Sequence, residues 1–212
     1  KSAVLPNFNA AAATTGTCPA SKVGPGVLST GVEIESSLRP ANDVSIGLGL
    51  TVANTRYRNN LVGNSSGVAL DPALRMLPGH KLSNAPAAVA TGSFTWTPPI
   101  GDTGLTGLLY VDGRVTSDYN TGSDLFPQKR QDGYAIVNGR IGIRGPRELW
   151  AVEVWAQNLF NQNYTQVAFN SPFQEGRTAA PFNTADYPGG AQTFSAFLAE
   201  PRTYGVTLRT RF

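Results

Sequence analysis

Alternation of apolar and polar residues is the sequence feature that most limits the fold of this chain. Between residues 44 and 52, the even-numbered positions carry only aliphatic side chains, and the odd-numbered positions carry only serine, glycine and threonine. Each such set of alternate positions is called a parity below. The aliphatic positions are Val44, Ile46, Leu48, Leu50 and Val52. Because successive side chains of a strand point to opposite faces, this pattern predicts a β-strand with one apolar and one polar face.

Seven segments show this alternation, and no segment of comparable length shows helical periodicity with caps. The expected strands cover residues 27–39, 43–58, 87–97, 104–117, 133–144, 149–160 and 203–212. All of them are longer than the usual strand of about 5–6 residues. The fold class expected from the residues is therefore all-β.

The connections between these strands alternate in length. Short turns are expected at 39–43, 98–103 and 145–148, and longer loops at 59–86, 118–132 and 161–202. If successive strands are antiparallel, all short turns lie at one end of the sheet and all long loops at the other. Outer-membrane β-barrels have this asymmetry, with short periplasmic turns and longer extracellular loops.

The charge content supports a lipid-facing sheet. Charged residues make up 15% of the chain and hydrophobic residues 41%, whereas about 25% charge is typical of a soluble domain. Nine strand charges share the polar parity, opposite the apolar side chains, as a lipid-facing sheet requires. They are Glu33, Glu35, Asp112, Arg114, Arg140, Arg144, Glu153, Arg209 and Arg211.

Aromatic residues are expected near both ends of the apolar face. Trp96, Trp150 and Phe212 lie beside the short-turn end, and Phe160 and Tyr204 lie toward the long-loop end. Two aromatic girdles of this kind flank the apolar band of a membrane barrel. The alternative is that these residues are core aromatics of a soluble β-sandwich.

Several other classes of protein are disfavoured. No apolar run approaches the ~20 residues of a membrane helix, and the basic residues form no run that indicates nucleic-acid binding. A single histidine, His80, and the absence of a G-x-S-x-G motif argue against an enzyme, a cofactor or a metal centre. The single cysteine, Cys18, excludes an internal disulfide, and we expect it to pair with a cysteine upstream of Lys1.

Two motifs resemble those of TonB-dependent outer-membrane receptors. The segment Asn158-Leu159-Phe160-Asn161-Gln162-Asn163-Tyr164 is similar to the family's N-L-F-[DN]-x-x-Y motif. Residues 201–212 resemble the family's closing strand with its terminal phenylalanine. Weaker matches at 31–35, 82–86 and 131–134 follow in the family's order.

The resemblance implies a 22-stranded barrel in the bacterial outer membrane, with a plug domain inside it. Residues 27–212 would be its C-terminal segment of about seven strands, and 1–26 an irregular extracellular segment, with the plug absent from this sequence. The implied function is uptake of a scarce metal chelate, vitamin or glycan, with energy supplied through the plug by the TonB complex. A small self-contained outer-membrane barrel with a structural or adhesive role is the alternative.

Candidate functional residues fall into four groups. The apolar residues of the last strand resemble the signal read by the barrel assembly machinery: Tyr204, Val206, Leu208 and Phe212. The motif that resembles the family's N-L-F-[DN]-x-x-Y segment is represented by Asn158, Leu159, Phe160 and Tyr164. Charges on the polar parity are candidates for contact with the plug: Glu33, Glu35, Arg140, Arg144, Glu153, Arg209 and Arg211. Aromatic residues of the last long loop are candidates for ligand binding: Tyr164, Phe169, Phe173, Phe182 and Tyr187.

Overall fold

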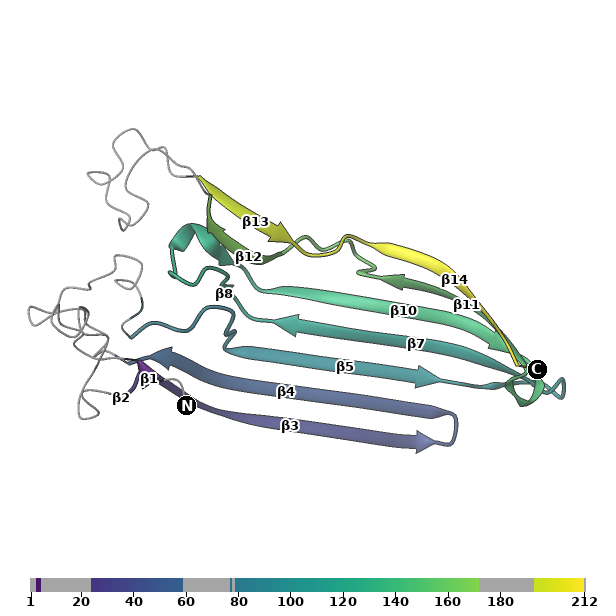
Figure 1. The fold of residues 1–212 in the computed structure, drawn as a ribbon. Coiled ribbons are helices and arrows are strands. Elements are labelled where there is room, and N and C mark those ends of the chain that lie inside the picture. Colours follow the sequence, from purple (N-terminus) through teal and green to yellow (C-terminus); the bar gives the residue numbers. More distant parts are fainter. Residues whose placement is uncertain (1–2, 5–23, 59–76, 78, 172–192, 212) are drawn as a thin grey trace, which may run out of the picture.

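The computed structural model describes residues 3–4, 24–58, 77, 79–171 and 193–211, where nearly all regular structure is antiparallel β-sheet (Figure 1). Seven long strands form one sheet in the order β14-β11-β10-β7-β5-β4-β3. They are β3 (Val27–Ala41), β4 (Val44–Tyr57), β5 (Ala88–Trp96), β7 (Leu105–Thr116), β10 (Tyr134–Arg144), β11 (Trp150–Gln157) and β14 (Thr203–Thr210). The expectation of an all-β, antiparallel barrel segment with about seven strands is confirmed.

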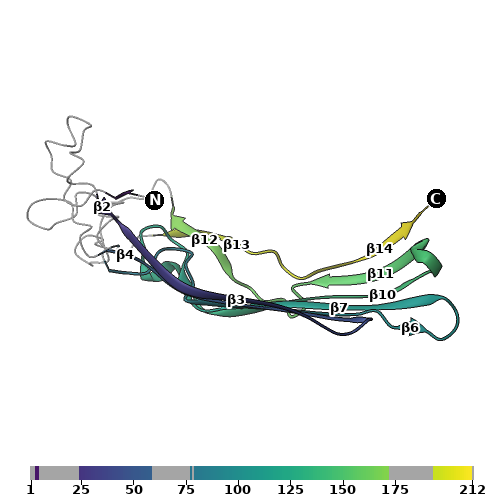
Figure 2. The same ribbon diagram turned by 90° about the horizontal axis from the view of Figure 1, so that it is seen from below.

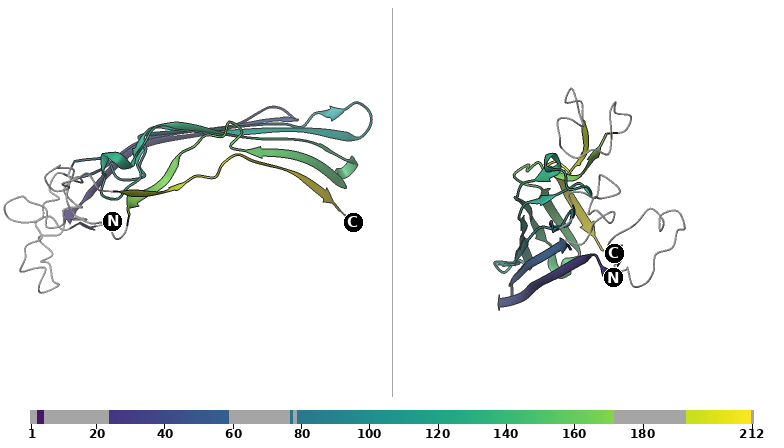
Figure 3. Two further views of the ribbon diagram at one scale, coloured as in Figure 1. Left: turned by 90° about the horizontal axis from the view of Figure 1, so that it is seen from above. Right: turned by 90° about the vertical axis from the view of Figure 1, so that its left-hand side faces the viewer.

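The sheet is curved and open. Figures 2 and 3 show β14 lifted out of the plane of β3 and β7. Within the described residues, β3 and β14 each pair with a neighbour on one side only. The strands therefore form part of a barrel wall that does not close on itself.

The connections segregate to the two ends of the sheet as the loop lengths predict. In Figure 1 the β3–β4, β5–β7 and β10–β11 connections lie at one end, and the described parts of the longer connections lie at the other. The turn after β5 includes β6 (Pro99–Ile100), and the turn after β10 includes the 3-10 helix η4 (Pro146–Glu148). Left-handed φ angles at Gly101 and Gly104 let the chain reverse direction before β7.

The long-loop end contains additional structure that the alternation did not predict. In the segment 161–202, expected to be a loop, β12 (Thr165–Asn170) and β13 (Phe194–Leu198) form an antiparallel hairpin. In the loop after β7, β8 (Tyr119–Asn120) pairs with β9 (Arg130–Gln131), and η3 (Pro127–Lys129) lies between them. In the N-terminal segment, β1 (Ala3–Val4) pairs with β2 (Gly24–Pro25).

Strand register assembles one continuous apolar face. A single row of paired residues crosses six strands from β4 to β14 without a polar side chain. The row runs Val44, Trp96, Leu109, Ile141, Val154 and Val206. The next row, on the opposite face, runs Ser45, Thr95, Tyr110, Arg140, Trp155 and Gly205.

Burial on the two faces is the reverse of that in a soluble sheet. The apolar side chains of Ile141 and Val206 are 57% and 65% exposed, whereas Glu153 on the polar face is 0% exposed. Soluble monomers rarely expose contiguous apolar patches above a few hundred Å². The described residues include no helix long and apolar enough to cross a membrane.

Candidate functional site

The polar face of β10, β11 and β14 carries a cluster of charges around one buried carboxylate. Arg140 Nη1 lies 3.1 Å from Glu153 Oε2, and Arg144 Nη2 lies 3.5 Å from Glu153 Oε1. Arg209 Nη2, on β14, lies 3.9 Å from Glu153 Oε2. Three guanidinium groups, two from β10 and one from β14, therefore surround the Glu153 carboxylate on β11, and we call these four residues the arginine cluster.

The backbone makes room for this carboxylate at Gly142. Gly142 lies opposite Glu153 in the β10–β11 register and between Arg140 and Arg144 on β10. A Cβ atom at this position would lie 2.9 Å from Glu153 Cγ and 2.6 Å from the Val152 carbonyl oxygen. Glycine at position 142 is therefore what lets Glu153 lie between the two arginines.

The arginine cluster carries more positive than negative charge. Arg144 also contacts Glu148 Oε1 at 3.3 Å, which leaves Arg140 and Arg209 with Glu153 as their shared partner. The Arg140 and Arg209 side chains are 40% and 59% exposed, so their remaining N–H donors face outward from the wall. Such an arrangement can bind a carboxylate or another anion.

The other candidate plug-facing residues do not join this cluster. Glu33 and Glu35 lie on the same face but on β3, at the opposite edge of the sheet. Arg211 follows β14, and its backbone N–H donates to the Leu149 carbonyl oxygen at 2.8 Å. The structure thus groups Arg140, Arg144, Glu153 and Arg209 and leaves the remaining three apart.

Trp155 on β11 and Thr207 on β14 lie next to the arginine cluster on the same face. Trp155 Nε1 donates a hydrogen bond to Thr207 Oγ1 at 3.2 Å. The indole ring lies over Gly205, where a Cβ atom would come within 2.6 Å of Trp155 Cζ2. Trp155 therefore lies flat against β14 and leaves the cluster accessible.

Asn158 in the N-L-F motif joins three segments at the long-loop end of β11. Its Oδ1 accepts from the Gln162 N–H at 2.7 Å, and its Nδ2 donates to the carbonyl oxygens of Gln162 at 2.9 Å and Glu200 at 3.2 Å. Its own N–H donates to Asn138 Oδ1 on β10 at 3.0 Å. Asn158 is buried and has a left-handed φ of 49°, which asparagine adopts more readily than most residues.

The other motif residues divide between packing and exposure. The Tyr164 ring stacks on Tyr134 with centroids 4.0 Å apart, and the Tyr134 and Tyr119 hydroxyls lie 3.3 Å apart. Leu159 and Phe160 are exposed, Phe160 at 73%. The motif thus fixes the path of the chain from β11 to β12 through Asn158 and Tyr164.

The candidate ligand-loop residues that the structure describes are engaged in packing. Phe169 on β12 packs against Phe197 on β13 at 5.6 Å between centroids, and Tyr164 stacks as described above. Phe173, Phe182 and Tyr187 lie outside the described residues, as do Cys18 and Phe212. Of the candidate assembly signal, Tyr204, Val206 and Leu208 project from the apolar face of β14 and are highly exposed.

Sequence reasoning missed a buried ion pair beneath the long loops. Lys129 Nζ lies 2.6 Å from Asp124 Oδ2, and both side chains are less than 10% exposed. Lys129 also lies over the rings of Phe126 and Phe194, at 4.9 and 5.5 Å from their centroids. This pair ties the β8–β9 segment to the β12–β13 hairpin, and no local pattern in the sequence indicates it.

Among the described residues, no three His, Cys, Asp or Glu side chains are grouped so that they could hold a metal ion. The chemistry that the described polar face offers is therefore binding by guanidinium, hydroxyl and aromatic groups.

Comparison with known proteins gives matches at the level of structure. No family model and no curated protein sequence matches the chain. Similar solved structures include the ferric yersiniabactin uptake receptor FyuA from Yersinia pestis, with 18% identity and a TM-score of 0.63 over 88% of this chain. The siderophore receptor PiuA from Acinetobacter baumannii has 14% identity and a TM-score of 0.58 over 86% of this chain. BauA, the ferric preacinetobactin receptor of the same organism, has 15% identity and a TM-score of 0.57 over 98% of this chain.

These likenesses concern part of each receptor. The chain covers 24%, 21% and 25% of FyuA, PiuA and BauA, respectively. It therefore has the fold of a segment of the barrel wall of TonB-dependent receptors and spans about a quarter of their length.

Proposed function

We propose that the chain is the C-terminal part of an outer-membrane β-barrel receptor that takes up a scarce ligand in an energy-coupled manner. The observation that carries this proposal is the exposed apolar face that crosses all seven long strands, on which the described strands carry a single charge, Arg56 at the long-loop end of β4. Lipid is the solvent in which such a face is stable, and closed barrels are the β-structures that span lipid. The likeness to uptake receptors supports this location and role.

The two free edges of the sheet require partners in a membrane. Unpaired N–H and C=O groups within hydrocarbon cost several kcal/mol each. We place further strands of the same barrel against β3 and β14, as in the 22-stranded family. A self-contained barrel made by these residues is less well supported, because β3 and β14 do not pair with each other.

The polar face is proposed to line the barrel interior and to contact a plug domain. The arginine cluster supports this role, because exposed guanidinium groups of Arg140 and Arg209 remain available beside the buried Glu153. The plug, rather than these residues, would then bind the TonB complex. The apolar face of β14 would be the part that the barrel assembly machinery recognises by strand pairing.

A ferric chelate is the ligand class we favour among metal chelates, vitamins and glycans. All three similar receptors are named for siderophores, two of them for ferric complexes. The proposed role is transport and not catalysis, so no chemical step is assigned to any residue.

An uptake assay that compares cells carrying the complete gene with cells lacking it tests the proposal. The probes are a ⁵⁵Fe-loaded hydroxamate siderophore, a ⁵⁵Fe-loaded catecholate siderophore, ⁵⁷Co-labelled cyanocobalamin and a ¹⁴C-labelled maltodextrin. We expect to find the protein in the outer-membrane fraction. We also expect one probe, an iron chelate in the favoured case, to accumulate only in cells that carry the gene. A protonophore should abolish this accumulation. Accumulation of every probe without dependence on the gene, or without sensitivity to the protonophore, contradicts energy-coupled uptake.

A further inference from the structure

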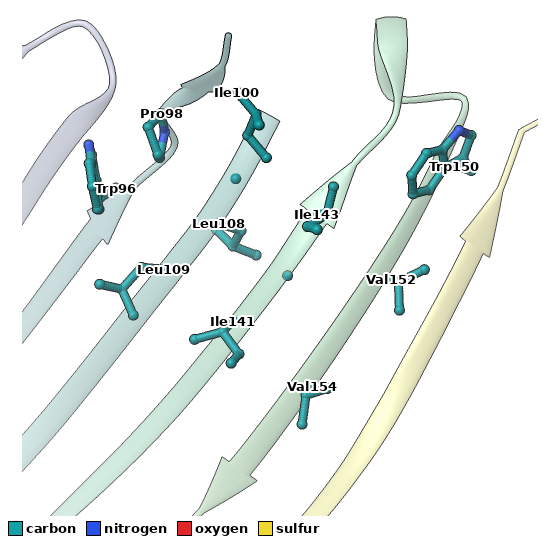
Figure 4. Close-up of a pocket in the computed structure, with 12 residues that line it drawn as sticks. Trp96, Pro98, Ile100, Leu108, Leu109, Ile141, Ile143, Trp150, Val152 and Val154 are labelled. Atoms are coloured by element: carbon teal, nitrogen blue, oxygen red, sulfur yellow. The ribbon is translucent and has the colours of Figure 1, made fainter. Parts of the chain in front are cut away.

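The apolar face contains a groove near the short-turn end of the sheet (Figure 4). Its volume is about 610 Å³, within the usual range of ligand sites of roughly 300–1,000 Å³. It crosses β7 and β10, with Trp96 on β5 at one side and Trp150 on β11 at the other, as Figure 4 shows. All side chains that line it are apolar.

The floor of the groove exists because residue 107 has no side chain. In the β7–β10 register, Gly107 lies opposite Ile143 on the apolar face. A Cβ atom at Gly107 would lie 3.3 Å from Pro98 Cγ, so the position is closely walled. The neighbouring side chains of Leu109, Ile141 and Ile143 rise around this gap.

Both tryptophan walls are held in place by the turns. Trp96 Nε1 donates to Asp43 Oδ2 in the β3–β4 turn at 3.0 Å. The Trp150 ring lies over Gly145, where any Cβ atom would overlap its Nε1, Cε2 and Cδ1 atoms. The groove is therefore preformed and does not depend on a ligand to order its walls.

The length of the groove matches one leaflet of a bilayer. Along β11 it extends from Trp150 to Val154, which is about 13 Å at roughly 3.3 Å per residue. At the tilt of barrel strands, about 35–45°, this length covers about 10 Å of membrane depth, and half of an apolar band of about 25 Å is about 12 Å. One end of the groove lies at the two tryptophans, which are typical of the membrane interface, and the other lies toward the middle of the apolar face.

The groove offers an occupant at most one side-chain hydrogen bond, from the indole N–H of Trp150 at its short-turn end. The Trp96 N–H is already used by Asp43. The strands β7, β10 and β11 are each paired on both sides, so none presents a backbone edge in the groove. An extended peptide laid there would leave its own amide groups unpaired, at high cost in an apolar setting, whereas a hydrocarbon chain has no such groups.

We propose that this groove is a binding site for one acyl chain of a phospholipid in the leaflet at the short-turn end. The proposal rests on the membrane location given under the proposed function. The headgroup lies beyond the tryptophans, at the level of the β10–β11 turn, where Arg147 is exposed and can meet the lipid phosphate. The site is distinct from the polar face and from any path for the transported ligand.

Native mass spectrometry of the complete protein tests this site. The protein is purified in mild detergent with added 1-palmitoyl-2-oleoyl-phosphatidylethanolamine, and the lipid retained per protein is counted. Val152→Phe places a ring in the groove, and Val115→Phe places the same ring on the same face outside it. Heat-modifiable mobility on gels checks that each variant folds. If Val152→Phe does not fold, Ile143→Phe is used in its place.

We expect one strongly retained phospholipid on the wild-type protein and on Val115→Phe. Retention by Val152→Phe should fall about tenfold, the loss expected when roughly two methylene groups no longer fit an apolar site. Equal retention by the two variants, or binding of detergent in place of phospholipid on the wild-type protein, overturns the proposal. Either result leaves probe uptake by the wild-type protein unaffected, so failure of the groove is distinguishable from failure of the transport role.

Discussion

Replacing Asn158 with alanine should destabilise the barrel strongly, although the residue lies outside the strands. The substitution removes three side-chain hydrogen bonds, to Gln162 N, Gln162 O and Glu200 O. Each such bond contributes about 1 kcal/mol net. It also places alanine at a φ of 49°, which costs a further ~1 kcal/mol because alanine lacks the short polar side chain with which asparagine offsets a left-handed backbone. We expect the free energy of unfolding to fall by about 4 kcal/mol.

Two companion variants separate these contributions. Asn158→Gly removes the same bonds but tolerates the left-handed backbone, so its loss should be smaller by roughly 0.5–1 kcal/mol. Asn161→Ala is the matched control, because Asn161 has a φ of 53° but is exposed and accepts a single bond, from Arg202 N at 3.0 Å. Its cost should be about 2 kcal/mol.

The assay is urea unfolding of the complete protein in detergent micelles, followed by tryptophan fluorescence and by gel mobility. Asn158→Ala should unfold at a clearly lower urea concentration than Asn161→Ala. If the two variants are equally stable, or if Asn158→Ala lies within ~1 kcal/mol of wild type, the assignment of Asn158 as the junction of three segments is wrong.

Three further perturbations test the two faces of the sheet. Val154→Arg, on the apolar face, should lower the unfolding free energy by about 2–4 kcal/mol, as charges do near the middle of a lipid-facing wall; Gln157→Arg, on the polar face, should change it by less than ~0.5 kcal/mol. Glu153→Gln should cost about 2 kcal/mol in the same titration, mainly through Arg144, because Arg140 and Arg209 are 40% and 59% exposed and so screened by water; equal stability of Glu153→Gln and wild type contradicts the arginine cluster. In the complete protein, a carbodiimide should cross-link the amine of an Arg209→Lys variant to a carboxylate of the plug, and mass spectrometry that finds Glu153 as the sole linked partner rejects plug contact.

Much of the fold follows from local sequence. The seven long strands begin and end within three residues of the ranges that alternation predicts, because a strand with one apolar and one polar face leaves a period-2 pattern along its whole length. The alternation also predicts that the side chains of the arginine cluster lie on one face of the sheet. It did not show which charges meet, since that depends on register between strands far apart in the chain.

The missed features have a common physical origin in long-range pairing. The β12–β13 hairpin joins Thr165–Asn170 to Phe194–Leu198, and neither short segment alternates long enough to be recognised. The Asp124–Lys129 pair is buried beside Phe194 of that hairpin, which lies far from it in the sequence. The groove depends on Gly107 lying opposite Ile143 and beside Pro98, and the sequence of a single strand does not show this pairing.

The most direct test of the central claim is spin-label accessibility along β11 of the complete protein in lipid vesicles. Single cysteines at positions 150–157, in a background with Cys18 and every other native cysteine replaced by serine, carry a nitroxide, and collision rates with oxygen and with a water-soluble nickel complex are measured. The structure predicts period-2 alternation, with oxygen collisions highest at positions 152 and 154 and no access there for the nickel complex. Access of the nickel complex to positions 152 and 154, or the absence of alternation, contradicts a lipid-facing barrel wall.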